Sequence, residues 1–234
     1  MQTKFVDSRR LFYGKYLYKA VVSLPKARII YDSAPVTECI TRRHTYHLSM
    51  HMFRNQVHNA ADTYGRFKEM YKISEERLNY YRTVYLESRD MRFRVEEPWL
   101  DIYSNDYDEL TAILRYDPDP QYNEIHRPAT DATRAIIERG EMVATERHNG
   151  VDYRVNVREG FVKHDIRNIL LSLAETYPTD VYLPKRFKEK ISSSAGHTWL
   201  SGYFYVNDLK LLTFINLVDP NFVTSFFKLT RPEQ

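Results

Sequence analysis

Two stretches of the chain decide its predicted fold: YSNDYDELTAILRYDP at residues 103–118 and YVNDLKLLTFINLVDP at residues 205–220. The offset between them is 102 residues (205 minus 103), and eight of the sixteen positions are identical, where unrelated segments would share roughly one. Helix caps and stops recur in any chain and explain about half of the matches. We interpret the rest as an internal repeat. The identical pairs are Tyr103/Tyr205, Asn105/Asn207, Asp106/Asp208, Leu110/Leu212, Thr111/Thr213, Ile113/Ile215, Asp117/Asp219 and Pro118/Pro220.

Each repeated stretch has the pattern of a strand followed by a helix. The Asn-Asp pair provides side-chain oxygens that cap a helix N-terminus. The apolar residues that follow, such as Leu110 and Ile113, lie on one side of that helix. Asp117-Pro118 ends it, because proline disfavours helical geometry in the residue before it.

Outward from these stretches, both halves of the chain follow the βαββαβ order of ferredoxin-like folds. We therefore predict an α+β fold of tandem ferredoxin-like (βαββαβ) repeats over residues 1–128 and 129–234, the first with a basic N-terminal strand and a long helical insertion. The predicted elements of the first repeat are strand 15–23, long helix 52–88, strands 91–96 and 99–104, helix 106–116 and strand 122–127. Those of the second are strand 151–157, helix 163–177, strands 180–184 and 202–206, helix 208–217 and strand 221–229.

Three further elements are expected outside this order. Residues 27–31 are a candidate strand within an insertion that runs to Met50. Thr130 to Arg139 is predicted to be a helix linking the repeats, ended by Gly140. Residues 142–147 and 151–157 flank Asn149-Gly150, and this dipeptide between alternating segments predicts a β-hairpin.

The long helix carries one stripe of mostly apolar residues, at alternating spacings of three and four. The stripe lies on one continuous helix or on two helices broken near Ile73-Ser74. It either packs within the protein or provides a homo-oligomer contact through the 57–85 helix. Its members are Val57, Ala60, Tyr64, Phe67, Tyr71, Ser74, Leu78, Tyr81 and Tyr85.

The composition argues against several classes of protein. The 234 residues include 19 tyrosines but only 7 glycines, which are too scattered for a dinucleotide-binding or phosphate-binding loop, so we expect no cofactor. Cys39 is the only cysteine, which excludes an intrachain disulfide and a cysteine zinc site. No signal-type segment or apolar run of about 18 residues is present. We therefore expect no membrane partner and a cytoplasmic location.

Charge is unevenly distributed along the chain. Residues 1–60 contain ten Lys or Arg and three Asp or Glu, a balance of +7, whereas residues 90–124 contain three and ten, a balance of −7. This asymmetry either steers an anionic partner to one face or neutralises itself within the fold.

The second half contains a strand that resembles the RNA-recognition-motif family. The third strand of that family has the pattern K/R-G-F/Y-G/A-F-V-x-F/Y, in which aromatic rings stack on unpaired bases. The segment SGYFYVND at residues 201–208 matches at Gly202, Tyr203, Tyr205 and Val206 and departs at three other positions, namely Ser201, Phe204 and Asp208. The resemblance implies RNA binding, with Tyr153 of the neighbouring strand as a further ring; ordinary core packing is the alternative.

Basic residues next to aromatic ones provide a second nucleic-acid signal, because single strands need both a phosphate track and stacking surfaces. They lie in the segments 12–19, 42–43 and 185–190. Our leading hypothesis is a protein that binds RNA or single-stranded DNA through a Tyr-rich sheet and flanking cations. The predicted contacts are Lys15, Tyr16, Tyr18, Lys19, Arg42, Arg43, Tyr153, Arg154, Lys185, Arg186, Lys188, Lys190, Tyr203 and Tyr205.

Two alternatives belong to other functional classes. One is a structural or assembly protein acting through protein contacts, for which the Tyr-rich, Gly-poor composition suggests a viral source. The other is a metal-independent ribonuclease in which His44, His47 or His51 acts as general base on a ribose hydroxyl. The spacing of these histidines also permits metal binding, but the glutamate of an H-E-x-x-H site is absent, so we predict no metal site and no catalytic residue.

Overall fold

The computed structural model describes residues 3–42, 74–119, 123–145, 150–193 and 198–232. The chain divides into two units, unit 1 (Met1–Ala129) and unit 2 (Thr130–Gln234). Each unit contains helices and one five-stranded sheet with both parallel and antiparallel pairs. The α+β prediction is therefore confirmed.

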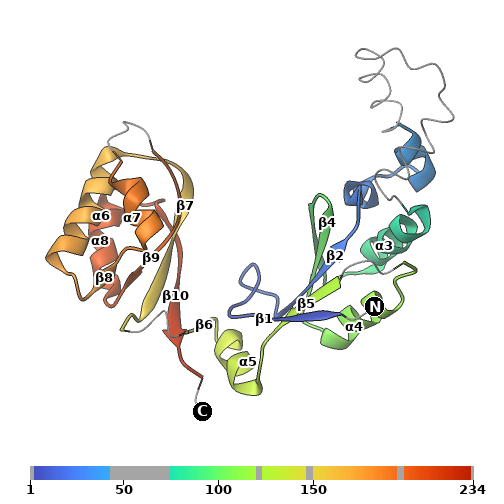
Figure 1. The fold of residues 1–234 in the computed structure, drawn as a ribbon, viewed down its shortest axis with the longest axis horizontal. Helices are drawn as coiled ribbons and strands as arrows, with labels where there is room; N and C mark the ends of the chain where they lie inside the picture. Colours follow the sequence, from blue (N-terminus) through green and yellow to red (C-terminus); the bar gives the residue numbers. More distant parts are fainter. Residues whose placement is uncertain (1–2, 43–73, 120–122, 146–149, 194–197, 233–234) are drawn as a thin grey trace, which may run out of the picture. The chain divides into compact units, whose positions relative to one another are not determined.

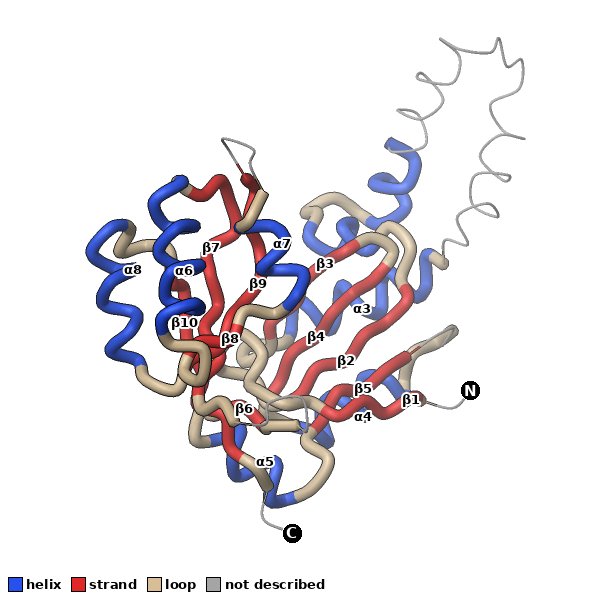
Figure 2. The backbone as a smooth tube through the Cα atoms, turned by 60° about the vertical axis from the view of Figure 1, so that its left-hand side comes forward, coloured by secondary structure: helices blue, strands red, loops and turns tan. Residues whose placement is uncertain are grey.

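Unit 1 is built on a sheet of order β1-β5-β2-β4-β3 (Figure 1). From β5 to β3 neighbouring strands are antiparallel, whereas β1 runs parallel to β5. Helices α3 and α4 lie on one face of this sheet (Figure 2). The elements are β1 (Lys4–Asp7), β2 (Tyr18–Ser23), the 3-10 helix η1 (Ala27–Tyr31), a helical segment over 36–42, α3 (Glu75–Glu87), β3 (Arg92–Glu96), β4 (Trp99–Ser104), α4 (Tyr107–Arg115) and β5 (Asn123–Arg127).

Unit 2 has the equivalent sheet, of order β6-β10-β7-β9-β8. From β10 to β8 the strands are antiparallel and β6 runs parallel to β10, so the two units share both strand order and pairing directions. Helices α6, α7 and α8 lie on one face (Figure 1). The elements are α5 (Asp131–Glu138), β6 (Met142–Val143), β7 (Tyr153–Val162), α6 (His164–Thr176), β8 (Val181–Tyr182), α7 (Lys185–Ile191), β9 (Thr198–Val206), the 3-10 helix η3 (Leu209–Leu211), α8 (Leu212–Val218) and β10 (Val223–Thr230).

The repeated asparagines make the same hydrogen bond in both units. Asn105 Oδ1 accepts from the backbone N–H of Leu17, 2.9 Å away, and Asn207 Oδ1 accepts from that of Asp152, 3.0 Å away. Leu17 and Asp152 each directly precede the central strand of their sheet, β2 or β7. Each asparagine therefore fixes where the central strand begins.

The repeated aspartates also have matching roles. Asp117 Oδ1 accepts from the N–H of Asp119, and Asp219 Oδ1 accepts from that of Asn221, both at 3.1 Å. This contact across two residues is the Asx-turn, which reverses the chain after a helix. Each turn precedes the strand that is last in chain order in its unit, β5 or β10.

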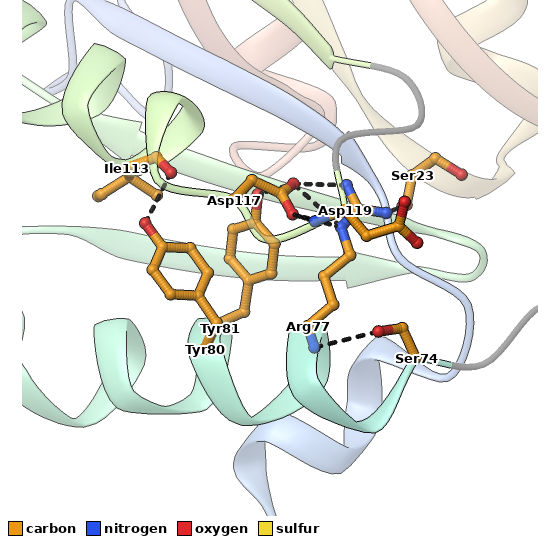
Figure 3. A network of polar contacts seen from close by, with 8 residues as sticks. All are labelled: Ser23, Ser74, Arg77, Tyr80, Tyr81, Ile113, Asp117 and Asp119. Atoms are coloured by element: carbon orange, nitrogen blue, oxygen red, sulfur yellow. Dashed lines mark hydrogen bonds and ion pairs between the residues drawn. The ribbon is translucent and has the colours of Figure 1, made fainter.

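In unit 1 the turn also anchors α3 through a buried ion pair (Figure 3). Arg77 and Asp117 have side chains that are 1% and 0% exposed, and Arg77 Nη2 lies 2.6 Å from Asp117 Oδ2. Arg77 also donates to the Ser23 carbonyl at 2.6 Å, and the Tyr81 hydroxyl donates to Asp117 at 2.8 Å. Burial, followed by the Asp117 carboxylate, raises the pKa of Tyr81 well above its usual value, so the hydroxyl keeps its proton.

Of the two possibilities for the predicted helix 52–88, one continuous helix or a break near Ile73-Ser74, the described residues show the break at Ser74. Ser74 has an extended backbone, with φ −100° and ψ 114°, and its side chain accepts from the N–H of Arg77 as the N-cap of α3. The single polar member of the stripe is therefore a helix start. Leu78 and Tyr81 are buried in unit 1, and Tyr85 packs on Tyr31 and Phe93. The C-terminal part of the stripe that we considered as an oligomer contact, from Leu78 to Tyr85, thus packs within unit 1. Its members from Val57 to Tyr71 lie outside the described residues.

Two local predictions near the repeats are wrong. Residues 27–31 form η1 and not a strand; the helix starts after Lys26, whose φ is +64°, and Ile29 and Ile30 are both buried, whereas strand residues alternate. Among the described residues, the strands on either side of Asn149-Gly150 do not pair with each other as a hairpin either. Residues 142–143 of β6 pair with β10 at the sheet edge, while β7 pairs with β10 and β9. An Asn-Gly dipeptide favours a turn but does not determine which strands pair.

Candidate nucleic-acid interface

The RNA-recognition-motif-like strand places its two matching tyrosines on the face of the unit 2 sheet that carries no helices. Neighbouring residues of a strand point to opposite faces, and Phe204 and Val155 are buried in the core on the helix side. Tyr203 and Tyr205 therefore point to the other face, which we call the open face. Asn156 and Arg154, which pair directly with them, point there too.

On the open face, the Arg154 guanidinium lies over the ring of Tyr203. The guanidinium carbon is 3.8 Å from the ring centroid. Arg154 Nε donates to Asn156 Oδ1 at 3.2 Å, and Asn156 Nδ2 donates to Ser225 Oγ at 2.9 Å. These bonds hold the guanidinium plane in place, and such a plane both stacks on bases and binds phosphate.

Tyr205 contributes less surface to the open face than the sequence suggested. It is 6% exposed, with the rings of Tyr203 and Tyr182 at 5.5 and 5.9 Å. Burial, followed by the neighbouring Tyr203, raises the pKa of Tyr205 to about 12. Its ring thus supports Tyr203, while Tyr182, 53% exposed, provides an accessible ring.

Farther along β9 lies an exposed aromatic pair that the sequence analysis did not select. Trp199 and Phe161 are 52% and 65% exposed, and their rings meet edge to face at 5.1 Å. Trp199 lies on the open face because it is four residues from Tyr203 on the same strand. Phe161 of β7 is directly opposite Trp199 and therefore lies on that face too. Trp199 Nε1 donates to Glu159 at 3.3 Å. A signal is present in the sequence, since Trp199-Leu200 precedes the second repeated stretch as Trp99-Leu100 precedes the first.

Tyr153 does not lie beside Tyr203, contrary to the expected grouping. It is opposite Val206 and packs against the buried core, on the helix side of the sheet. The one-residue step from Arg154 explains this, because it reverses the face. Tyr153 therefore belongs to the core and not to the open face.

The basic segment 185–190 also lies on the helix side. It forms α7, whose Phe187 ring stacks on the core residue Phe204 at 6.1 Å. Gly202, which matched the family pattern, makes this packing possible, since a Cβ at that position would be 3.3 Å from Phe187. The basic side chains of α7 are exposed, but the sheet separates them from Tyr203. They are Lys185, Arg186, Lys188 and Lys190.

The N-terminal basic-aromatic segment is mainly packed within unit 1. Tyr18 is 8% exposed and lies 5.3 Å from the ring of Tyr107. Tyr16 is equally buried, with Lys15 Nζ 5.1 Å above its ring. Lys19 forms an ion pair with the buried Asp101 at 2.9 Å. Of these four predicted contacts, only Lys15 is well exposed.

The rings of this segment cover the unit 1 counterpart of the open face. Phe12, Tyr13 and Tyr16 pack on Tyr103, the repeat partner of Tyr205, at 5.7, 5.0 and 6.2 Å. Arg92 lies over the ring of Tyr13 at 3.7 Å. In unit 1, residues 12–16 therefore cover the sheet face that corresponds to the open face of unit 2, where Tyr203 and Tyr205 lie.

The remaining predicted residues contribute little to this interface. Arg42 forms an ion pair with Glu38, one helical turn away. Arg43 and the three histidines proposed as general bases, His44, His47 and His51, lie outside the described residues. The described residues contain no group of His, Cys, Asp and Glu able to hold a metal ion, and among them no helix has the length and hydrophobicity needed to cross a membrane.

Unit 1 has an open cavity of about 720 Å³, lined by Arg28, Tyr31, Asp32, Ser33 and Val95. None of these is a predicted contact, so the open face of unit 2 is the better candidate. Comparison with protein-family models, curated proteins and solved structures finds no match to the chain.

Proposed function

We propose that each unit is a ferredoxin-like fold with one added edge strand, and that unit 2 binds RNA or single-stranded DNA on its open face. The fold proposal is supported by the strand order, in which the last, first, third and second strands of each βαββαβ unit lie side by side and antiparallel. The functional proposal rests mainly on Arg154, held over Tyr203 on a face with accessible rings.

In this proposal unpaired bases stack on Trp199 and on the Arg154–Tyr203 pair. The two sites are four residues apart on one strand, which separates them by roughly 13 Å. Bases stack on any aromatic face regardless of sequence, at about 1–3 kcal/mol per base. We therefore expect binding to unstructured single strands with little sequence preference.

Fluorescence polarisation with labelled oligo-U RNA and oligo-dT DNA tests this function. Trp199→Ala is expected to weaken binding about 5- to 150-fold, the equivalent of one lost stacked base. Phe214→Ala is the matched control, since Phe214 on α8 is 53% exposed but lies outside the open face. The absence of binding to either oligomer at 50 mM salt refutes the proposal.

Salt dependence separates the open face from the basic helix α7. If Arg154 neutralises one phosphate, raising salt from 50 to 200 mM weakens binding about threefold, whereas four phosphates on α7 would give about 50-fold. Arg154→Gln should weaken binding and reduce the salt dependence. A steep dependence that Arg154→Gln leaves unchanged would assign binding to α7.

A further inference from the structure

One irregularity of the unit 2 sheet lies beside the exposed aromatic pair of β7 and β9. Val157 is opposite Gly202 but Gly160 is opposite Leu200, so β7 has one more residue than β9 between these two pairs. This is a β-bulge, which changes the direction of a side chain and is common next to functional sites. The corresponding strands of unit 1, β2 and β4, keep one register over all their residue pairs.

The two residues within the bulge, Arg158 and Glu159, have different partners. The backbone N–H of Arg158 donates to the Phe222 carbonyl at 2.7 Å, and its guanidinium forms an ion pair with Asp219 at 3.0 Å. The carboxylate of Glu159 instead accepts from the indole N–H of Trp199, with Oε1 3.3 Å from Nε1. Glu159 and Trp199 are both exposed. A carboxylate therefore lies at the edge of an accessible indole ring on the open face.

The position of Phe161 leaves indole surface available for stacking. Its ring meets that of Trp199 at 87°, so the two rings do not stack in parallel. Trp199 keeps about half of its surface exposed. Unpaired bases stack on such rings and form hydrogen bonds with their edges. A base that stacks on the indole and extends beyond Nε1 brings one edge to the Glu159 carboxylate.

A carboxylate distinguishes the bases by their donors, because in its ionised form it only accepts hydrogen bonds. The Watson–Crick edge of guanine has two adjacent donors, N1–H and N2–H, which match the two carboxylate oxygens as the paired donors of arginine do. Adenine and cytosine have one amino donor next to an acceptor nitrogen, and uracil and thymine have one N–H between two carbonyl oxygens. These acceptors repel a carboxylate. The bond from Trp199 uses only one of about four lone pairs on Glu159, so the others can accept from guanine.

We propose that Trp199, Phe161 and Glu159 form a guanine-preferring subsite, in which the base stacks on the indole and donates N1–H and N2–H to the carboxylate. The subsite rests on the proposed function, the binding of single strands by the open face. Stacking alone gives little sequence preference, and the carboxylate adds a preference at the one position that occupies Trp199. Hydrogen bonds to a charged group are among the stronger ones, but water competes at an exposed site, so we expect guanine to be favoured about five- to tenfold.

Oligo-U RNA in which a single uracil is replaced by guanine, adenine or hypoxanthine tests the preference. In fluorescence polarisation at 50 mM salt, the guanine oligomer should bind about five- to tenfold more tightly than the adenine oligomer. Hypoxanthine has N1–H but no N2 amino group, so its oligomer should bind with intermediate affinity.

Variants of the full chain locate the preference. Glu159→Ala should give the guanine and adenine oligomers equal affinities and still bind oligo-U, because the indole remains. Glu175→Ala is the matched control, since it removes the same charge from an exposed position on α6, on the helix side of the sheet, and should keep the preference. Trp199→Ala should weaken binding of every oligomer and abolish the preference.

The possible results separate the subsite from the proposed function. If no oligomer binds, oligo-U included, the proposed function is refuted and the subsite with it. Binding of oligo-U with equal affinities for guanine and adenine overturns the subsite alone. A guanine preference that persists in Glu159→Ala also overturns it. An indole beside a carboxylate suits a cation as well; equal affinities, together with quenching of Trp199 fluorescence by a tri-arginine peptide in a Trp99→Phe background, would assign the site to a cationic partner.

Discussion

Replacing Asp117 by asparagine is expected to destabilise unit 1 by about 3–5 kcal/mol, because it leaves the buried Arg77 guanidinium without its counter-charge. Three hydrogen bonds join the two side chains, from Nε to both carboxylate oxygens at 2.8 and 3.0 Å and from Nη2 at 2.6 Å. An asparagine keeps one acceptor oxygen for the Asx-turn. Its NH2 group, however, would face the donors of Arg77 and Tyr81.

The repeat provides a matched control at Asp219. This residue makes the same turn, but its ion pair is with Arg158, whose side chain is 46% exposed. A solvent-exposed pair contributes about 0–1 kcal/mol. Asp219→Asn, which also keeps the turn acceptor, should therefore destabilise unit 2 by no more than that amount.

Urea denaturation can measure both effects, since Trp99 lies in unit 1 and Trp199 in unit 2. In a Trp199→Phe background the only tryptophan is Trp99, so the fluorescence reports the unfolding of unit 1. In a Trp99→Phe background the only tryptophan is Trp199, so it reports the unfolding of unit 2. With a slope of about 2 kcal/mol per molar urea, a loss of about 4 kcal/mol lowers the unit 1 midpoint by about 2 M. Equal shifts for the two substitutions would refute the reasoning, because burial would then have no influence on the ion pair.

Two further predictions concern single residues. Burial, followed by Lys19, lowers the pKa of His126 below 6.5; the unfolded chain then binds the proton more tightly, so unit 1 loses stability as pH falls below about 6.5. His126→Gln should reduce the difference in urea midpoint between pH 7.5 and 5.5, and an unchanged difference would contradict this. Gly202→Ala should destabilise unit 2 by about 1–3 kcal/mol more than Gly160→Ala. Both glycines have positive φ, 141° and 152°, but only at Gly202 would the new Cβ crowd Phe187, at 3.3 Å. Equal urea midpoints for the two variants would rule that contact out as the cause.

Local signals in the sequence predicted most elements close to where they lie. The strand at 99–104 has the expected bounds, and Asp106 caps α4 as the repeat suggested. These features depend on residues a few positions apart, which a sequence displays directly. The errors concern partners distant in the chain. β1 was not predicted, since residues 4–7 are mostly exposed and gain their structure from β5.

In the candidate site, too, local features were predicted and contacts between distant residues were not. The pattern at 201–208 placed Tyr203 on the open face, because alternation along one strand is a local property. Whether a ring stays exposed depends on its neighbours in other strands and loops. Tyr16 and Tyr205 are buried in part by rings distant in the chain, Tyr103 of β4 and Tyr182 of β8. The Phe161–Trp199 pair was missed because its members, 38 positions apart (199 minus 161), meet only across two strands.

The hydrogen bonds of the repeated asparagines also define the length of the loop that each unit must close when its central strand meets the neighbouring strand. The bond from Leu17 to Asn105 spans 88 residues and that from Asp152 to Asn207 spans 55. Closure entropy grows only with the logarithm of loop length, so the difference is about 0.4 kcal/mol, or about a factor of two in rate. Unit 2 is therefore expected to fold first. The extra sequence between the first strand and first helix of unit 1 delays its folding only slightly, and this connection is the place where the topology tolerates growth.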